Sequence, residues 1–122
     1  MRVQESKENY IEAILVLSKQ KGQVRSIDVA NYLEFSKPSV SVAMANLRQA
    51  ELITVDENGF IHLTDDGRKL ANQVYERHQL LTDLLTRIGV SEKVAAEDAC
   101  RIEHVLSQDS FDKIKEYIGK LN

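Results

Sequence analysis

The sequence predicts a mainly α-helical protein in which an N-terminal winged helix-turn-helix with a two-stranded wing precedes an all-helical dimerisation domain. Apolar residues recur at helical spacing along most of the 122-residue chain. One pair of short β-branched or aromatic runs, at residues 52–55 and 60–63, interrupts that pattern. Charged residues make up 29% of the chain and aromatic residues 6%, with no Trp and one Pro, which is typical of a soluble helical protein.

The first three helices are predicted from apolar spacing and from residues that can cap a helix. Helix one is expected after the possible cap Ser6 and before Gly22, on the apolar positions Tyr10, Ile11, Ile14, Leu15 and Leu17. Ser26 is expected to cap a second helix. Ser36 is expected to cap a third, whose first turn tolerates Pro38. The short link between the second and third helices predicts a helix-turn-helix.

A hairpin follows the third helix. Residues 52–55 and 60–63 read as strands, and the Asn58-Gly59 pair between them favours a tight turn. Two strands directly after a helix-turn-helix form a wing.

Three further helices are predicted beyond the wing. Thr64 resembles an N-cap for a long helix that Gly89 ends, and Ser91 can cap the next one. Asp109 or Ser110 is expected to start the last helix. These helices are amphipathic, and their apolar faces would most economically be buried against a second copy of the chain, so a two-fold homodimer is expected.

The chain length suits one domain plus an assembly segment. The DNA-binding part is expected to end within the long helix. We therefore predict a DNA-binding domain over residues 1–72 and a dimerisation and metal-binding domain over residues 73–122.

The charge balance restricts where DNA could bind. Sixteen Lys and Arg against nineteen Asp and Glu give a formal charge of −3, which argues against a broadly basic nucleic-acid binder. Residues 36–50 nevertheless contain no acidic residue and include Lys37 and Arg48. A local DNA surface is therefore expected on the third helix.

Small polar residues open that helix, where side chains approach base edges and backbone amides can hold phosphate. The predicted DNA contacts are Ser36, Lys37, Pro38, Ser39 and Ser41, with Arg25 as a possible backbone contact. The alternative is that Ser36 is merely a cap and the helix pair a generic packing unit. The wing that follows favours the DNA interpretation.

Cys100, Glu103 and His104 stand at i, i+3 and i+4, which places three potential metal ligands on one helical face. One turn cannot complete a coordination sphere, so ligands from other helices are needed, and His78 and Glu12 are candidates. A single buried His is more often hydrogen-bonded core than ligand, and a single Glu is more often solvated. Spacing alone leaves both interpretations open.

Other features set the expected compartment. A lone Cys excludes an intramolecular disulfide, and no charged-then-apolar leader opens the chain, so we expect a cytoplasmic protein. Charges interrupt every apolar stretch well short of the roughly 20 residues that span a bilayer, so no membrane segment is expected.

Four segments resemble the metal-dependent transcriptional repressors of the diphtheria-toxin-repressor and manganese-transport-regulator family, along nearly the whole chain. They are residues 8–12, 36–41, 76–81 and 97–107, of which the last is the most specific. The resemblance implies a winged helix-turn-helix joined to a helical dimerisation domain, with a divalent metal between them as corepressor. By positional match, the implied ligands are Asn9, Glu12, His78, Cys100, Glu103 and His104.

Several positions depart from one branch of the family or the other. Asn9 replaces the Asp of the manganese branch and the Met of the iron branch, and Cys100 replaces a bridging Glu of the manganese branch. A thiolate favours iron, cobalt, nickel or zinc over manganese, so we expect iron(II) in preference to manganese(II), with zinc or cobalt binding possible in vitro. Thr82 and Ala96 match positions of a second iron-branch site and are poor ligands, so one metal per protomer is expected. Since the sequence stops at Asn122, we expect the shorter domain plan of the manganese branch and not the C-terminal β-barrel of the iron branch.

The predicted function is therefore that of a divalent-metal-responsive transcriptional repressor controlling metal homeostasis genes. Its dimer should bind a pseudo-palindromic operator with half-sites about one helical turn apart. The alternative is a winged-helix regulator that senses a small organic ligand or oxidation of Cys100 without metal. An enzyme is not expected, because no His-Glu-x-x-His helix or glycine-rich nucleotide loop is present.

Overall fold

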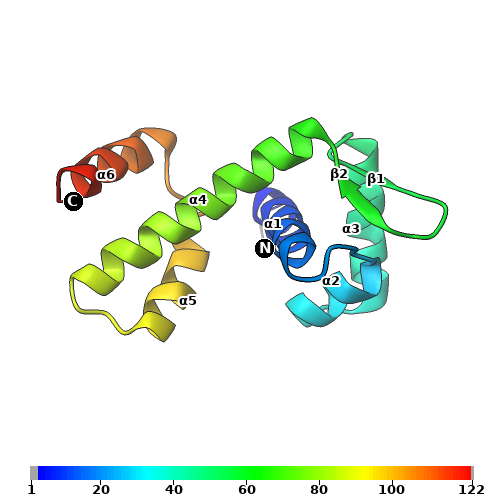
Figure 1. Ribbon diagram of the computed structural model, residues 1–122, viewed down its shortest axis with the longest axis horizontal. Helices are drawn as coiled ribbons and strands as arrows, with labels where there is room; N and C mark the ends of the chain where they lie inside the picture. Colours follow the sequence, from blue (N-terminus) through cyan, green and yellow to red (C-terminus); the bar gives the residue numbers. More distant parts are fainter. Residues whose placement is uncertain (1–2, 122) are drawn as a thin grey trace. The chain divides into compact units, whose positions relative to one another are not determined.

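The structure is a computed structural model that describes the backbone of residues 3–121 and the side chains of residues 7–121. Six helices and one antiparallel hairpin follow one another along the described chain (Figure 1). Their bounds are α1 Val3–Lys21, α2 Ser26–Leu33, α3 Lys37–Gln49, β1 Ile53–Val55, β2 Ile61–Leu63, α4 Asp65–Arg87, α5 Glu92–Ile102 and α6 Gln108–Leu121. The predicted fold class is confirmed.

The chain divides into two compact units, Met1–Asn72 (unit 1) and Gln73–Asn122 (unit 2). Unit 1 packs α1, α2 and α3 together and adds the hairpin against α3 and α1. Its most deeply buried side chains come from every one of these layers and include Ile11, Ile14, Val29, Val40 and Ile53. The hairpin is tied to the rest by a backbone hydrogen bond of 2.7 Å from the N–H of Ile61 to the carbonyl of Val24. α3 is thus held on a continuous apolar core.

Two of the predicted helix starts in unit 1 are wrong, and one is confirmed. α1 begins at Val3, before the expected cap Ser6. α2 begins with Ser26 itself, and Arg25 is its N-cap residue. The carboxylate of Asp28, in the first turn, accepts the N–H of Arg25 at 2.9 Å. Ser36 caps α3 as predicted, with its Oγ accepting the N–H of Ser39 at 3.3 Å.

The wing contains the predicted tight turn at Asn58-Gly59, because the N–H of Gly59 donates to the carbonyl of Asp56 at 3.0 Å. Val55 pairs with Ile61, which leaves residues 56–60 as the loop. The Asp56 carboxylate organises this loop by accepting the N–H groups of Asn58 at 2.9 Å and Phe60 at 3.0 Å. Gly59 supplies the positive φ of 84° that the turn needs.

α4 starts and ends as predicted. Thr64 accepts the N–H of Gly67 at 3.0 Å, and Gly89, with a φ of 108°, follows the last turn. At Gly67 the helix passes so close to the carbonyl oxygen of Leu52 that a Cβ atom would overlap it. Only glycine therefore fits this crossing of α4 and the segment before β1.

Ser91 caps α5 as predicted, accepting the N–H of Val94 at 3.4 Å. The last helix starts earlier than predicted. α6 begins at Gln108, and the Oγ of Ser107 accepts the N–H of Ser110 at 3.1 Å, so Ser107 takes the capping role expected of Asp109 or Ser110. No helix within residues 3–121 is both long and apolar enough to span a membrane.

Candidate metal centre

Three potential ligands gather where α5 ends. Cys100 lies in its last turn, Glu103 is the C-cap, and His104 lies in the turn that follows. One donor atom of each lies within 4.8 Å of the others. The predicted i, i+3, i+4 spacing therefore does bring the three side chains together. Cys100 is exposed and Glu103 is buried, so the group runs from the surface inwards.

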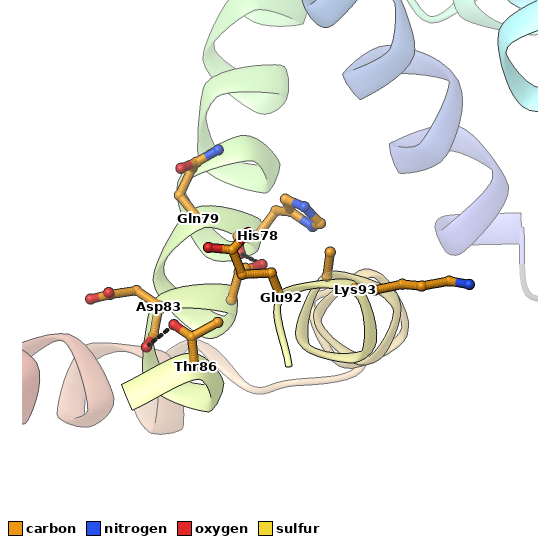
Figure 2. A pocket seen from close by; sticks show the side chains of 8 residues that line it. His78, Gln79, Asp83, Thr86, Glu92 and Lys93 are labelled. Atoms are coloured by element: carbon orange, nitrogen blue, oxygen red, sulfur yellow. Dashed lines mark hydrogen bonds between the residues drawn. The ribbon is translucent and has the colours of Figure 1, made fainter. Parts of the chain in front are cut away.

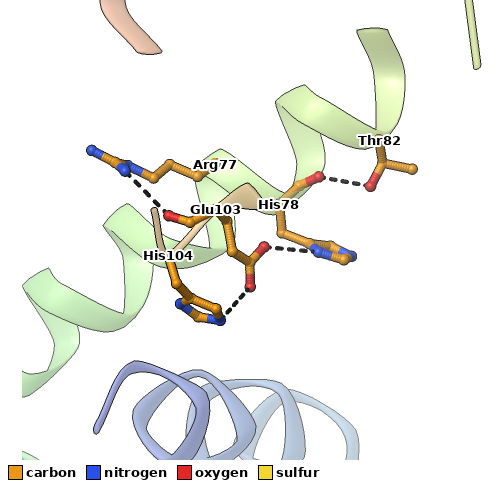
Figure 3. Close-up of polar contacts among 5 residues, drawn as sticks. All are labelled: Arg77, His78, Thr82, Glu103 and His104. Atoms are coloured by element: carbon orange, nitrogen blue, oxygen red, sulfur yellow. Dashed lines mark hydrogen bonds and ion pairs between the residues drawn. The ribbon is translucent and has the colours of Figure 1, made fainter. Parts of the chain in front are cut away.

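Glu103 is the centre of this group. It is 1% exposed and is the only charged residue that is buried in the described part of the chain. Figure 3 shows its carboxylate between two imidazoles, with Oε2 2.9 Å from Nδ1 of His78 and Oε1 3.4 Å from Nε2 of His104. Within the described residues, Oε1 accepts no hydrogen bond. A buried carboxylate is costly unless it is paired or coordinates a cation.

His78 reaches this carboxylate from α4. The side chain is 26% exposed, and its Nδ1 contact with Glu103 spans 25 positions of the sequence. Sequence reasoning named both residues but had no means of placing them within hydrogen-bond distance. The contact joins the predicted Cys-x-x-Glu-His group to a second helix of the same unit.

The donor set fits a divalent transition metal. Carboxylate, imidazole and thiolate are the side-chain ligands of zinc and of late first-row metals, and the orphaned Oε1 of Glu103 is the kind of buried acceptor that such a cation would satisfy. The residues present therefore fit the metal that the family resemblance implies. Asn9 and Glu12, the other predicted ligands, both lie half-buried on α1 in unit 1.

An open space of about 620 Å³ borders the centre in unit 2, lined by His78, Gln79, Thr82, Asp83, Thr86, Glu92, Lys93 and Ala96 (Figure 2). Some of the polar groups that line this space have hydrogen-bond partners nearby. Thr82 donates to the carbonyl of His78 at 2.7 Å, and Asp83 accepts from Arg87 at 3.0 Å. Ala96 offers no donor atom. Of the two positions that match a second site of the family, Ala96 therefore cannot ligate and the Thr82 hydroxyl is already engaged.

The predicted DNA contacts on α3 are exposed, as a reading surface requires. Ser36, Lys37, Pro38, Ser39 and Ser41 are all exposed, and Arg25 is exposed at the start of α2. The Ser36 hydroxyl donates to the hydroxyl of Ser39 at 2.9 Å, so these two side chains form one polar unit at the helix start. The guanidinium of Arg25 lies 4.5 Å from the centre of the Phe60 ring in the wing loop.

Val42 was missed in the sequence. It is 62% exposed on α3, whereas Val40, Met44 and Leu47 of the same helix are buried. Its position four residues after Pro38 is the signal that could have found it, because residues at i and i+4 share a helical face. An exposed valine on the face that carries the predicted contacts adds an apolar group to that surface.

Two carboxylates of unit 1 have lowered pKa values. The pKa of Asp28 is held below its ordinary value first by the hydrogen bond from the Lys21 ammonium, at 2.6 Å, and then by the Arg25 backbone. The pKa of Asp56 is lowered first by the hydrogen bond from His62. The lowered pKa values favour the ionised form of Asp28 at the start of α2 and of Asp56 in the wing loop. Tyr10 differs, because burial raises the pKa of its phenol.

Two family models match consecutive parts of the chain. The model described as "Iron dependent repressor, N-terminal DNA binding domain" matches residues 2–59, and "Iron dependent repressor, metal binding and dimerisation domain" matches residues 64–122. The transcriptional regulator MntR of Escherichia coli O157:H7 is 33% identical over 113 residues, covering 93% of this chain and 73% of the relative. The HTH-type transcriptional regulator MntR of Geobacillus kaustophilus is 35% identical and is covered to 80%.

Solved structures share the fold. T. acidophilum IdeR superposes with a TM-score of 0.82 at 27% identity, covering 92% of this chain and 53% of that one. ScaR with bound Zn²⁺ superposes with a TM-score of 0.78 at 26% identity, covering 93% of this chain and 53% of that one. This chain therefore spans about half the length of these two neighbours.

Proposed function

This chain belongs to the iron-dependent repressor family, and on that basis we propose that His78, Cys100, Glu103 and His104 hold the metal that controls its binding to DNA. It is a metal-responsive DNA-binding transcriptional repressor and not an enzyme. The observation that carries the proposed ligand set is the buried carboxylate of Glu103, which lies between the imidazoles of His78 and His104.

We propose that unit 1 contributes Asn9 and Glu12 to the ligand set, a proposal that rests on the sequence resemblance alone. A bound divalent cation would place a positive charge beside the Glu103 carboxylate, which is costly to bury unless it is paired or coordinated. The two histidines orient that carboxylate: His78 fixes Oε2 from α4, and His104 lies against Oε1 from the turn after α5. The site would then be partly arranged before the metal arrives.

Iron(II) is the metal we propose, ahead of manganese(II). The thiol of Cys100 is a soft donor and disfavours manganese, while zinc and cobalt should bind in vitro. A single metal per protomer is supported by the Thr82 hydroxyl, which donates to the His78 carbonyl, and by Ala96, which has no donor atom.

We propose that residues 1–72 form the DNA-binding domain and residues 73–122 the dimerisation and metal-binding domain. A homodimer would present two copies of α3 to a pseudo-palindromic operator with half-sites about one helical turn apart. Ser36, Lys37, Pro38, Ser39 and Ser41 are the proposed contacts at the start of α3, with Arg25 at the backbone. Val42 would add an apolar contact suited to a thymine methyl group.

The ligand set is tested by anaerobic titration of chelator-stripped protein with iron(II), manganese(II), cobalt(II) and zinc(II). The variant Glu103→Gln keeps the shape of the side chain and removes its charge, so metal affinity should fall by about 100-fold or more. Glu97→Gln is the matched control, because Glu97 is an exposed residue of α5, the helix that Glu103 caps. Equal affinities of the two variants would remove Glu103 from the site.

Function is tested on DNA enriched from a randomised duplex library by the metal-loaded protein. Chelation should abolish binding to the enriched sequence, and metal should restore it in the wild type but not in Glu103→Gln. If chelator leaves DNA binding unchanged and oxidation of Cys100 alters it, the protein would instead be a thiol sensor. For cobalt(II), Cys100→Ser should remove the thiolate charge-transfer absorption if the thiol is a ligand.

A further inference from the structure

The turn between α5 and α6 carries two of the proposed ligands and has little regular structure of its own. α5 ends at Ile102, α6 begins at Gln108, and Glu103 and His104 lie between them. The backbone bonds of the turn run back to α5, from the N–H of Glu103 to the carbonyl of Ala99 at 2.9 Å and from the N–H groups of Val105 and Leu106 to the carbonyl of Ile102 at 3.0 Å each. They tie the turn to α5 but not to α4. Ligands on such a turn need an outside support to keep a fixed geometry.

Arg77 of α4 supplies such a support. Its Nη1 donates to two carbonyl oxygens of the turn, that of Glu103 at 3.2 Å and that of Leu106 at 2.6 Å. Its Nη2 donates to Oε1 of Gln108 at 2.9 Å, and the guanidinium lies 5.2 Å from the centre of the Phe111 ring. Figure 3 shows the Arg77 side chain reaching the Glu103 carbonyl beside the His78–Glu103 contact.

These contacts act on the same residue that the metal would use. Arg77 holds the main chain of Glu103, and its neighbour His78 holds the carboxylate of Glu103. Two consecutive residues of α4 therefore fix Glu103 at both ends. A guanidinium suits this task because it is planar and presents several N–H donors in a fixed fork, which an ammonium cannot reproduce.

We propose that Arg77 is a positioning residue of the metal centre, which holds the turn of Glu103 and His104 in its ligating geometry without touching the metal. The inference rests on the proposed ligand set. The two effects of removing Arg77 on metal affinity have opposite signs. Removing a positive charge close to a cation site should by Coulomb's law alone tighten metal binding. Losing a positioning contact should weaken metal binding.

The test compares Arg77→Met with Arg101→Met by anaerobic titration with cobalt(II), following the visible absorption of the bound ion. Arg101 is an exposed residue of the last turn of α5 and directly follows Cys100, so its variant removes the same charge from the same region. Arg77→Met should weaken cobalt(II) binding by about 10- to 100-fold and change the absorption envelope. Arg101→Met should bind as the wild type or slightly tighter.

All titrations are made well below the unfolding temperature of each variant, so that a purely structural role for Arg77 lowers the melting temperature without changing the metal affinity.

The metal affinity of Arg77→Lys should lie between those of the wild type and Arg77→Met, because one donor can still reach a carbonyl. It also decides the question if Arg77→Met does not fold, since wild-type affinity in Arg77→Lys overturns the proposal. Arg77→Met binding as tightly as Arg101→Met overturns it too, while the ligand set stands if Glu103→Gln still fails to bind. A wild type that binds no metal overturns both.

Discussion

Unit 1 and unit 2 reach stability in different ways. Of the 21 buried hydrophobic residues in the described chain, fifteen lie in unit 1 and six in unit 2, whereas five of the eight exposed large hydrophobics lie in unit 2. Those five are Ile88, Val94, Val105, Tyr117 and Leu121. Unit 1 thus closes an apolar core of its own, while unit 2 leaves apolar surface uncovered, which is the property of a domain that pairs with another copy.

The interiors also differ in kind. Unit 2 contains the buried Glu103, with Arg77 and His78 bonded to it, and the described part of unit 1 buries no charged residue. A buried carboxylate costs stability that an apolar side chain of similar volume would not. The polar centre therefore lowers the stability of unit 2 in the isolated chain. We expect bound metal and a partner copy to raise that stability.

The largest difference in stability should appear when one glycine of each unit is replaced by alanine. Gly67→Ala places a Cβ on the carbonyl oxygen of Leu52, backbone that cannot move away without shifting the entry to β1. We expect a loss of about 3 kcal/mol in the free energy of unfolding of unit 1. Gly119→Ala in α6 meets nothing within 4 Å and should be neutral or stabilising by up to about 1 kcal/mol. Denaturant unfolding measures both, and equal effects would contradict the close packing of α4 at Leu52.

The sequence predicted periodic and local features well. Apolar spacing placed six helices, and the caps Ser36, Thr64 and Ser91 were correct because a cap depends on residues within one turn. The caps of α2 and α6 were wrong because several hydroxyls and carboxylates near each start could serve, and only backbone geometry decides among them. The tight turn at Asn58-Gly59 was predicted correctly, because it too depends on neighbouring residues, while the added hydrogen bonds of the Asp56 side chain were not predicted.

At the candidate site, the Cys-x-x-Glu-His group was visible from helical spacing, but its relation to α4 was not. The His78–Glu103 distance and the three hydrogen bonds of Arg77 depend on how α4 packs against the segment after α5. No periodicity in one sequence encodes that packing. A positioning role for Arg77 is therefore not predictable from the sequence, although Arg77 adjoins a predicted ligand.

A second, smaller effect should follow from one substitution made at an exposed valine of each unit. Val94 on α5 is 45% exposed and Val42 on α3 is 62% exposed. Val94→Glu places a charge on the apolar surface of unit 2 and should weaken the dimer by about 100-fold. Val42→Glu should leave the dimer intact and weaken binding to the enriched DNA, because the new carboxylate meets phosphate charge.

Sedimentation at several protein concentrations measures the dimer, and fluorescence anisotropy measures DNA binding. The reverse pattern, with Val42→Glu dissociating the dimer, would contradict the division of labour between the two units. An undisturbed dimer in Val94→Glu would move the partner surface away from the start of α5 to the other exposed apolar positions of unit 2.

The smallest effect concerns two ion pairs, one in each unit. Asp28 in unit 1 accepts both the Lys21 ammonium and the Arg25 backbone N–H in the first turn of α2, so Asp28→Asn should cost about 1 kcal/mol at pH 7. Because the pKa of Asp28 is lowered in the folded state, this stability is present above the unfolded-state pKa and is lost as the pH falls through the folded-state pKa. The difference between wild type and variant should therefore vanish in strong acid.

In unit 2, Glu76 and Lys115 pair at 3.2 Å with side chains 52% and 54% exposed, so the free energy of unfolding of Glu76→Gln should stay within about 0.5 kcal/mol of the wild type at every pH. Urea unfolding of both variants across pH 2–7 would contradict this contrast if the surface pair of unit 2 proved as costly to break as the capping pair of unit 1.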